Sequence, residues 1–197
     1  MKFLRSARIP IALALVVVGA AVALYPQATE WRYAWAQQAM ADEVAGAPAT
    51  AEVVGATPGI QAGMAMPRGA VARVVVSEIG LDAFVVQGVE KAQLDRAVGH
   101  YPETPLPGEK GNAALAGHRT MFGHPFRHLD ALKRGDTIET WTATKHAVYR
   151  VIKIDRVDPG NVGVIAPTEG SRITLTTCNP VGSARERLIV TGELVTN

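Results

Sequence analysis

The single cysteine, Cys178, is the first residue to consider, because a thiolate is a strong nucleophile. It ends the alternating run ITLTTC, in which Thr174, Thr176 and Cys178 share a polar face and the apolar residues face the core. The Asn-Pro that follows ends the strand, so the thiol lies at a strand end beside a loop, where reactive groups are commonly presented. A buried structural cysteine is the alternative interpretation.

A nucleophilic thiol needs a base or a cationic partner, and the chain has five histidines. His118 follows the apolar run AALA and a glycine, which puts it at a strand end that opens onto a loop. His124 and His128 lie on or just before a predicted helix, where we expect them to be solvated. They are four residues apart, but no third ligand accompanies them, so we expect no metal site. Spacing alone leaves His118 either as the partner of the thiol or as an ordinary hydrogen-bonded histidine.

A hydrophobic segment near the N-terminus indicates where this chemistry takes place. Residues 9–25 contain 17 positions without a charge and follow a basic tail, residues 1–8, with three cations and no acid. Such a helix spans roughly 26 Å, just short of a hydrocarbon core of about 30 Å. Because positive charge stays in the cytoplasm, we predict a single-pass anchor with the rest of the chain outside the cell membrane. A cleaved signal peptide is the alternative, since the AAVA at 20–23 could supply a cleavage site.

Aromatic and small residues follow the predicted anchor. Trp31, Tyr33 and Trp35 are spaced as in the aromatic belt of a membrane interface. Residues 41–70 are rich in Ala, Gly and Pro and have neither strict alternation nor a helical stripe, which is typical of a tether. We therefore assign residues 26–70 to a juxtamembrane segment and a flexible linker.

From residue 71 onward, short apolar runs alternate with turn residues. The predicted strands are residues 71–76, 84–86, 113–116, 137–142, 147–154, 173–177 and 188–194. Residues 91–98 and 125–133 read as short helices. A length of 197 residues allows one compact domain with appendages. Many short strands with few helices predict a mostly β domain over residues 71–197, either a closed barrel or a sandwich.

Charge and composition exclude several classes of function. Beyond residue 8 the chain carries 17 basic and 18 acidic residues, so it lacks the basic surface that nucleic-acid binding needs. A hydrophobic fraction of 48% excludes wholesale disorder. One cysteine allows neither an internal disulfide nor a cysteine-based zinc site. We expect no nucleic-acid partner, no metal and no cofactor.

Three motifs, with two shorter segments between them, occur in a specific order. GNAALAGHR, with His118, precedes GHPF and then LKRGD; TLTTCNP follows with its cysteine 60 positions after His118, and RLIV comes last. Together they resemble the sortase family of cysteine transpeptidases over residues 71–197, nearly the whole predicted exported domain. The GHRT with GxPF, and TLTTCxP, look most like the class E branch of that family.

This resemblance implies a closed eight-stranded β-barrel with two or more short helices and a catalytic set of Cys178, His118 and Arg187. Cys178 would attack the Thr–Gly carbonyl of an LPxTG-like sorting signal, or of the LAxTG form that class E members favour. His118 would protonate the leaving amine and later deprotonate the incoming one. Arg187 would hold the oxyanion or the substrate backbone. The implied partners are secreted proteins with the sorting signal and an amine of a peptidoglycan precursor, while the substrate-binding residues stay unassigned.

Two other arginines are adjacent to the motifs. Arg185 lies two residues before Arg187 and shares its face if the strand starts early, so parity does not choose between them. The position directly before LIV matches the family pattern and favours Arg187. Arg119 follows His118 and points to the opposite side of a continuing strand, so we interpret it as a surface charge.

Two other functions stay open: a pilin-polymerising sortase and a non-catalytic envelope binding module that uses the same groove. Some sortases are gated by an N-terminal lid with an Asp-Pro-aromatic motif. The only similar segment here, DPG at 158–160, comes too late and lacks the aromatic residue. An open groove, which suits wall anchoring, is therefore expected. The sequence order of Cys and His, and the residues around Cys178, do not fit papain-like or caspase-like proteases.

Overall fold

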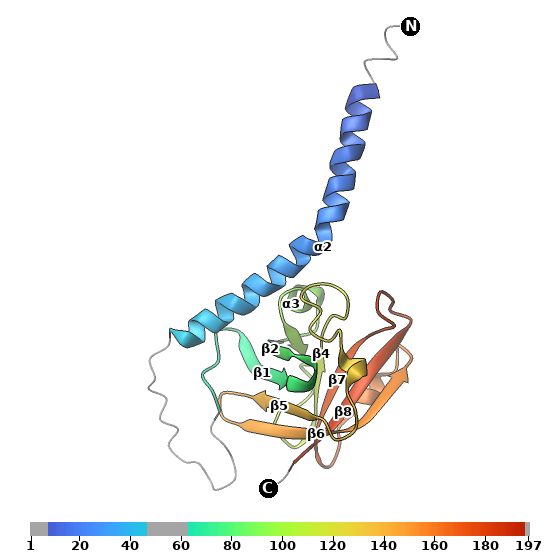
Figure 1. Ribbon diagram of the computed structural model, residues 1–197. Coiled ribbons are helices and arrows are strands. Elements are labelled where there is room, and N and C mark those ends of the chain that lie inside the picture. Colours follow the sequence, from blue (N-terminus) through green and yellow to red (C-terminus); the bar gives the residue numbers. More distant parts are fainter. Residues whose placement is uncertain (1–7, 47–62, 196–197) are drawn as a thin grey trace.

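The computed structural model describes residues 8–46 and 63–195. After residue 69, strands with apolar residues at every second position form a closed barrel (Figure 1). The eight strands of the described residues are β1 (Ala70–Val76), β2 (Leu81–Gln87), β3 (Val98–His100), β4 (Gly111–Ala116), β5 (Thr137–Trp141), β6 (His146–Val157), β7 (Ser171–Asn179) and β8 (Glu186–Leu194). They pair in the closed order β1-β2-β3-β4-β7-β8-β6-β5. The predicted eight-stranded barrel is confirmed.

The barrel interior is filled by every second residue of the strands. On β7 these are Ile173 and Leu175, and on β8 they are Leu188 and Val190, all buried. β4 runs parallel to β7, whereas β8 runs antiparallel to β7. Because strand partners point the same way, the remaining residues of these three strands lie together on the outer surface of the barrel.

Neither predicted helix of the barrel domain forms over its full range. The first is α3 (Lys91–Leu94), after which the chain enters β3, because Val98 pairs with Val85 of β2. The second, residues 125–133, is wrong as a helix and contains only the 3-10 turn η2 (Leu129–Ala131). Its apolar side chains fill the end of the barrel, where Phe126 and Leu129 are fully buried, and do not form the stripe of a continuous helix.

The N-terminal helix, α2 (Arg8–Ala45), is much longer than the predicted anchor. It passes through Pro26, and Figure 1 shows a bend between an upper half that projects away from the barrel and a lower half that crosses it. Residues 12–28 are all exposed, and the helix is long and apolar enough to cross a membrane. The stretch after Pro26 is rich in Ala, Gln and Glu, which favour helix, so the first part of the predicted linker is helical.

The remainder of the predicted linker falls in two parts. Residues 47–62 lie outside the described residues. After them, the chain runs beside the β5–β6 turn, where the Met64 amide donates a hydrogen bond to the Thr142 carbonyl at 3.0 Å. The segment that directly precedes β1 is therefore attached to the barrel.

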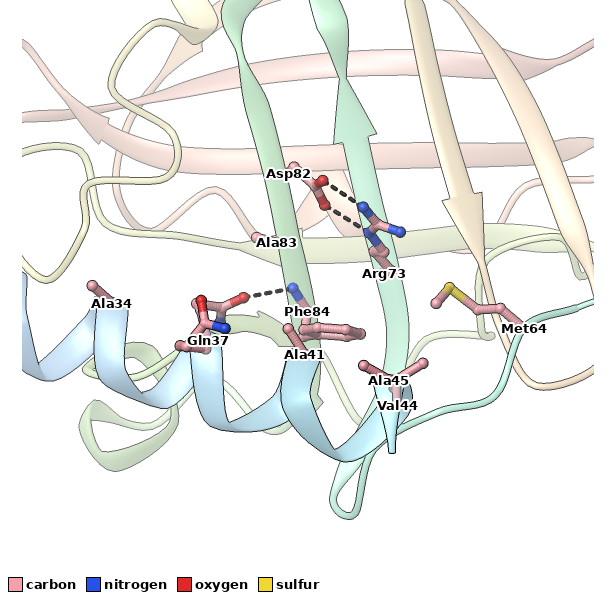
Figure 2. Close-up of a pocket in the computed structure, with 11 residues that line it drawn as sticks. Ala34, Gln37, Ala41, Val44, Ala45, Met64, Arg73, Asp82, Ala83 and Phe84 are labelled. Atoms are coloured by element: carbon pink, nitrogen blue, oxygen red, sulfur yellow. Dashed lines mark hydrogen bonds and ion pairs between the residues drawn. The ribbon is translucent and has the colours of Figure 1, made fainter. Parts of the chain in front are cut away.

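The lower half of α2 is docked on the barrel. Figure 2 shows Gln37 accepting a hydrogen bond from the backbone amide of Phe84 in β2, at 2.8 Å. Tyr33 is buried against the barrel, which removes it from the predicted aromatic belt. Trp31 and Trp35 point outward, at 77% and 74% exposure, and stay available for a membrane interface.

Candidate active site

Cys178 and Arg187 lie directly opposite each other on neighbouring strands. They are register partners in the antiparallel pair β7 and β8. Directly opposed residues have Cβ atoms about 4.5–5.5 Å apart and point to the same face. Cys178 as a residue is partly exposed, so a substrate can approach it beside Arg187.

His118 reaches Cys178 from the other side of β7. Ala116, the last residue of β4, is the register partner of Thr176 in the parallel pair. The pairing continues one residue further, because the Gly117 amide donates to the Thr176 carbonyl at 3.2 Å and the Thr177 hydroxyl donates to the Gly117 carbonyl at 2.7 Å. His118 lies two residues after Ala116, and Cys178 lies two residues after Thr176. Neighbouring strands are about 4.8 Å apart, so the two side chains come out side by side.

The outer face behind this trio consists of small side chains. Ala114 and Ala116 of β4 lie beside Thr174 and Thr176 of β7. The sequence predicted a polar face here opposite the core, and in the structure both threonines of this face are buried. The loop with the 3-10 turn η3 (Val162–Ile165) covers the far end, where the hydroxyl of Thr174 donates to the side chain of Asn112 at 2.8 Å.

The imidazole of His118 is half-buried between aromatic and charged groups. Its Nε2 lies 3.8 Å from the Oδ1 of Asp95, and its ring lies 5.2 Å from the ring of Phe122. Burial lowers the pKa of His118 below its usual value; the Asp95 carboxylate raises it and the Lys91 ammonium lowers it further. The net effect favours the neutral ring, which can accept a proton from a thiol.

Tyr101 is a neighbour of the site that no sequence motif identifies. It continues β3 alongside β4, where its amide donates to the Ala114 carbonyl at 3.0 Å. Burial raises the pKa of its phenol, the Arg187 charge lowers it, and a Cys178 thiolate raises it, so the phenol is close to both groups. No strand was predicted at this position, because the predicted helix 91–98 included Val98, the first residue of β3.

The other two arginines lie away from the thiol. Arg185 precedes β8 and lines a separate hollow that Arg119 also lines. The interpretation of Arg119 as a surface charge is wrong, because its residue is only 3% exposed. Its guanidinium donates to the Cys178 carbonyl at 3.5 Å and to the side chain of Asn179, and lies 2.8 Å from a carboxylate oxygen of Asp130. Arg119 therefore holds the backbone around Cys178 from the opposite side of β7.

The remaining histidines have other surroundings. His100 is buried, and its ring nitrogens lie 3.0 Å from the side chain of Gln87 and from the Pro105 carbonyl. His124 is half-exposed, with its Nε2 3.7 Å from a carboxylate oxygen of Glu30, and His128 is exposed. In the described part of the chain no group of three His, Cys, Asp or Glu side chains could hold a metal ion.

Comparisons with known proteins agree with the motifs. The sortase domain model matches residues 74–195. The chain is 41% identical to sortase SrtE1 of Streptomyces coelicolor over 127 residues, 56% of this chain and 36% of that protein. It is 31% identical to sortase D of Bacillus subtilis over 125 residues, 61% of this chain and 62% of that protein. The chain thus spans less than two thirds of either relative.

A solved structure gives the same result for the fold. The crystal structure of sortase E1 from Streptomyces coelicolor with a tripeptide in the active site superposes with a TM-score of 0.61 at 35% identity, covering 64% of this chain and 88% of that one. The barrel and the family model together cover well over half of the chain. The chain therefore belongs to the sortase family, whose members are cysteine transpeptidases, and within it resembles class E.

Proposed function

We propose that this chain is a membrane-anchored transpeptidase that cleaves an LPxTG-like or LAxTG-like sorting signal between Thr and Gly and joins the threonine to an amine of the cell envelope. The observation that supports this most is the register across β4, β7 and β8, in which His118 and Arg187 flank Cys178. The partial exposure of the residue Cys178 supports access of an extended peptide to the nucleophile.

In the first half of the reaction, the Cys178 thiolate attacks the threonine carbonyl. The guanidinium of Arg187 donates hydrogen bonds to the oxyanion that forms. It already donates to the carbonyls of Ala184 and Glu186 at 3.3 and 3.2 Å, so its head is held at the start of β8. Collapse of the tetrahedral intermediate breaks the Thr–Gly bond, and protonated His118 gives its proton to the leaving glycine amine. The product is a thioester between Cys178 and threonine.

In the second half, an amine attacks this thioester. Neutral His118 takes the proton of the amine, a new amide forms, and the thiolate leaves. An amine of a peptidoglycan precursor is the proposed acceptor. The burial of His118 helps at this stage, because it favours the neutral ring that must act as a base.

We also propose the cell membrane as the location of the chain, with residues 1–8 in the cytoplasm, the upper half of α2 across the bilayer and the domain of residues 71–197 outside. The run of exposed apolar residues in α2 supports this location. The basic tail before it supports the orientation.

The test is a peptide-cleavage panel with the full chain in detergent. The pentapeptide varies at its second position, with Pro and Ala as the first two choices, and an amine acceptor is added. We expect a thioester adduct on Cys178 by mass spectrometry, an amide product, and neither in a Cys178→Ala variant. Cleavage that persists in Cys178→Ala would refute the mechanism. A chain that cleaves no peptide, and whose folded Cys178 resists a thiol reagent, would instead be a binding module.

A further inference from the structure

The lower half of α2 contacts the loop that follows His118. Tyr33 packs on Gly123, where an added Cβ would lie 2.0 Å from the Tyr33 ring, and Glu30 faces His124. The residues of α2 that turn inward repeat every three or four positions, as expected for one helical face. The helix that carries the predicted membrane anchor thus also packs on the loop that follows His118.

Asp95 connects this helix to His118. It caps α3, its side chain is only 5% exposed, and its two oxygens face different partners. Oδ2 lies 2.5 Å from the Nζ of Lys91 and 3.5 Å from the Nη2 of Arg32, which belongs to α2. Oδ1 faces the Nε2 of His118 at 3.8 Å. A carboxylate held by two cations on one oxygen keeps the other oxygen directed at the imidazole.

The two facing atoms are both buried and unpaired. Among the described residues, neither the Oδ1 of Asp95 nor the Nε2 of His118 has a hydrogen-bond partner. Leaving a buried polar atom unpaired costs about 1–3 kcal/mol, and catalytic hydrogen bonds are often long before substrate binds. A shift of less than 1 Å would satisfy both atoms at once.

We propose that Asp95 is a positioning residue for His118, and that α2 holds Asp95 in place through Arg32. The proposal rests on the function proposed above. With Nε2 directed at Asp95, the ring presents Nδ1 for the proton that passes between thiol, leaving amine and incoming amine. When His118 is protonated, the carboxylate stabilises the imidazolium and keeps its orientation.

Two charged groups act on the imidazole directly: Asp95, which caps α3, and Lys91 of α3. Arg32 of α2 acts through Asp95, and the strand register adds Cys178 of β7, with Arg187 of β8 beyond it. Asp95 and Lys91 act on the ring with opposite sign. If replacing Asp95 and replacing Lys91 shift the pKa of His118 in opposite directions, their role is electrostatic. A general loss of stability would not produce shifts of opposite sign.

The experiment uses the full chain in detergent, with histidine titrations followed by NMR. Asp95→Asn should lower the pKa of His118, and Lys91→Gln should raise it. Asp95→Asn should also reduce kcat about tenfold or more with little change in KM, since it removes an interaction that matters in the transition state. Arg32→Gln should reduce kcat severalfold alone and have no further effect in the Asp95→Asn background.

Two matched substitutions control for charge. Arg68→Gln and Asp158→Asn each change one exposed residue that makes no side-chain contact with Asp95, and both should leave kcat and the His118 titration unchanged. The proposal is overturned if Asp95→Asn leaves both the titration of His118 and kcat unaltered. An equal effect of Arg32→Gln in both backgrounds would exclude the role of α2. If no peptide is cleaved, the proposed function fails, but the titration still decides whether Asp95 acts on His118.

Discussion

Cys178 of β7 and Arg187 of β8 are partners in one antiparallel register, so a thiol and a guanidinium are presented from the same outer face of the barrel. Neither strand achieves this alone, because the two residues are in different strands joined by a loop. The same face carries Ala116 and Thr176, whose pairing brings His118 to the other side of the thiol. The site is thus a property of three neighbouring strands.

The register predicts which arginine takes part in catalysis. Arg187→Ala should slow formation of the acyl-enzyme by about 10²–10³-fold, because it removes donors to the oxyanion. Arg185→Ala should change that rate less than about threefold, since Arg185 lies before β8 and lines a hollow with Arg119. Rapid-quench mass spectrometry of the thioester measures both variants. A greater loss in Arg185→Ala would reverse the assignment.

The pH dependence of kcat/KM should be bell-shaped. Attack requires an ionised thiol, while departure of the amine requires a protonated imidazole, and the rate reflects the fraction of enzyme in this combined form. Burial lowers the pKa of His118 from 6.5, so the acid limb should lie below pH 6.5. The profile is measured with a sorting peptide from about pH 5 to 10. A single sigmoid would contradict the two-group scheme.

Gly117 should not tolerate even a methyl group. A Cβ there would lie 2.9 Å from the ring of Phe126, which is fully buried and cannot move aside easily. Gly117→Ala should therefore lower the free energy of unfolding by about 1–3 kcal/mol. Urea unfolding followed by tryptophan fluorescence tests this. Gly160→Ala, where an added Cβ meets nothing within 4 Å, is the control, and equal midpoints for the two variants would refute the packing argument.

Arg119 should matter for stability and, through the backbone of Cys178, for the rate. Arg119→Met keeps the apolar stem but leaves the side chain of Asn179 without its buried donor, which costs about 1–3 kcal/mol. The ion pair with Asp130 adds little, because that carboxylate is half-exposed. Thermal unfolding and thioester formation are measured against Arg134→Met, an exposed arginine. A stability equal to that of the control would show that the guanidinium is dispensable.

Local patterns in the sequence determined the strands and the chemistry. Alternation of apolar residues is a property of a few consecutive positions, so it predicted the seven longer strands without knowledge of their partners. It left a barrel and a sandwich open, and the resemblance of the motifs to sortases predicted the barrel. The motifs around His118 and Cys178 gave the reaction class, because each motif lies within one short segment. The two-residue alternation also put Cys178 on the face opposite Ile173 and Leu175, as the structure has it.

Only the tertiary structure decided what depends on contacts between distant segments. The register of β7 and β8 separated Arg187 from Arg185, and the packing of loops buried Arg119. The approach of α2 to Asp95 joins residues 63 positions apart, and no local pattern carries that information. Pairing and packing depend on which surfaces meet when the whole chain folds, whereas strand formation depends on immediate neighbours.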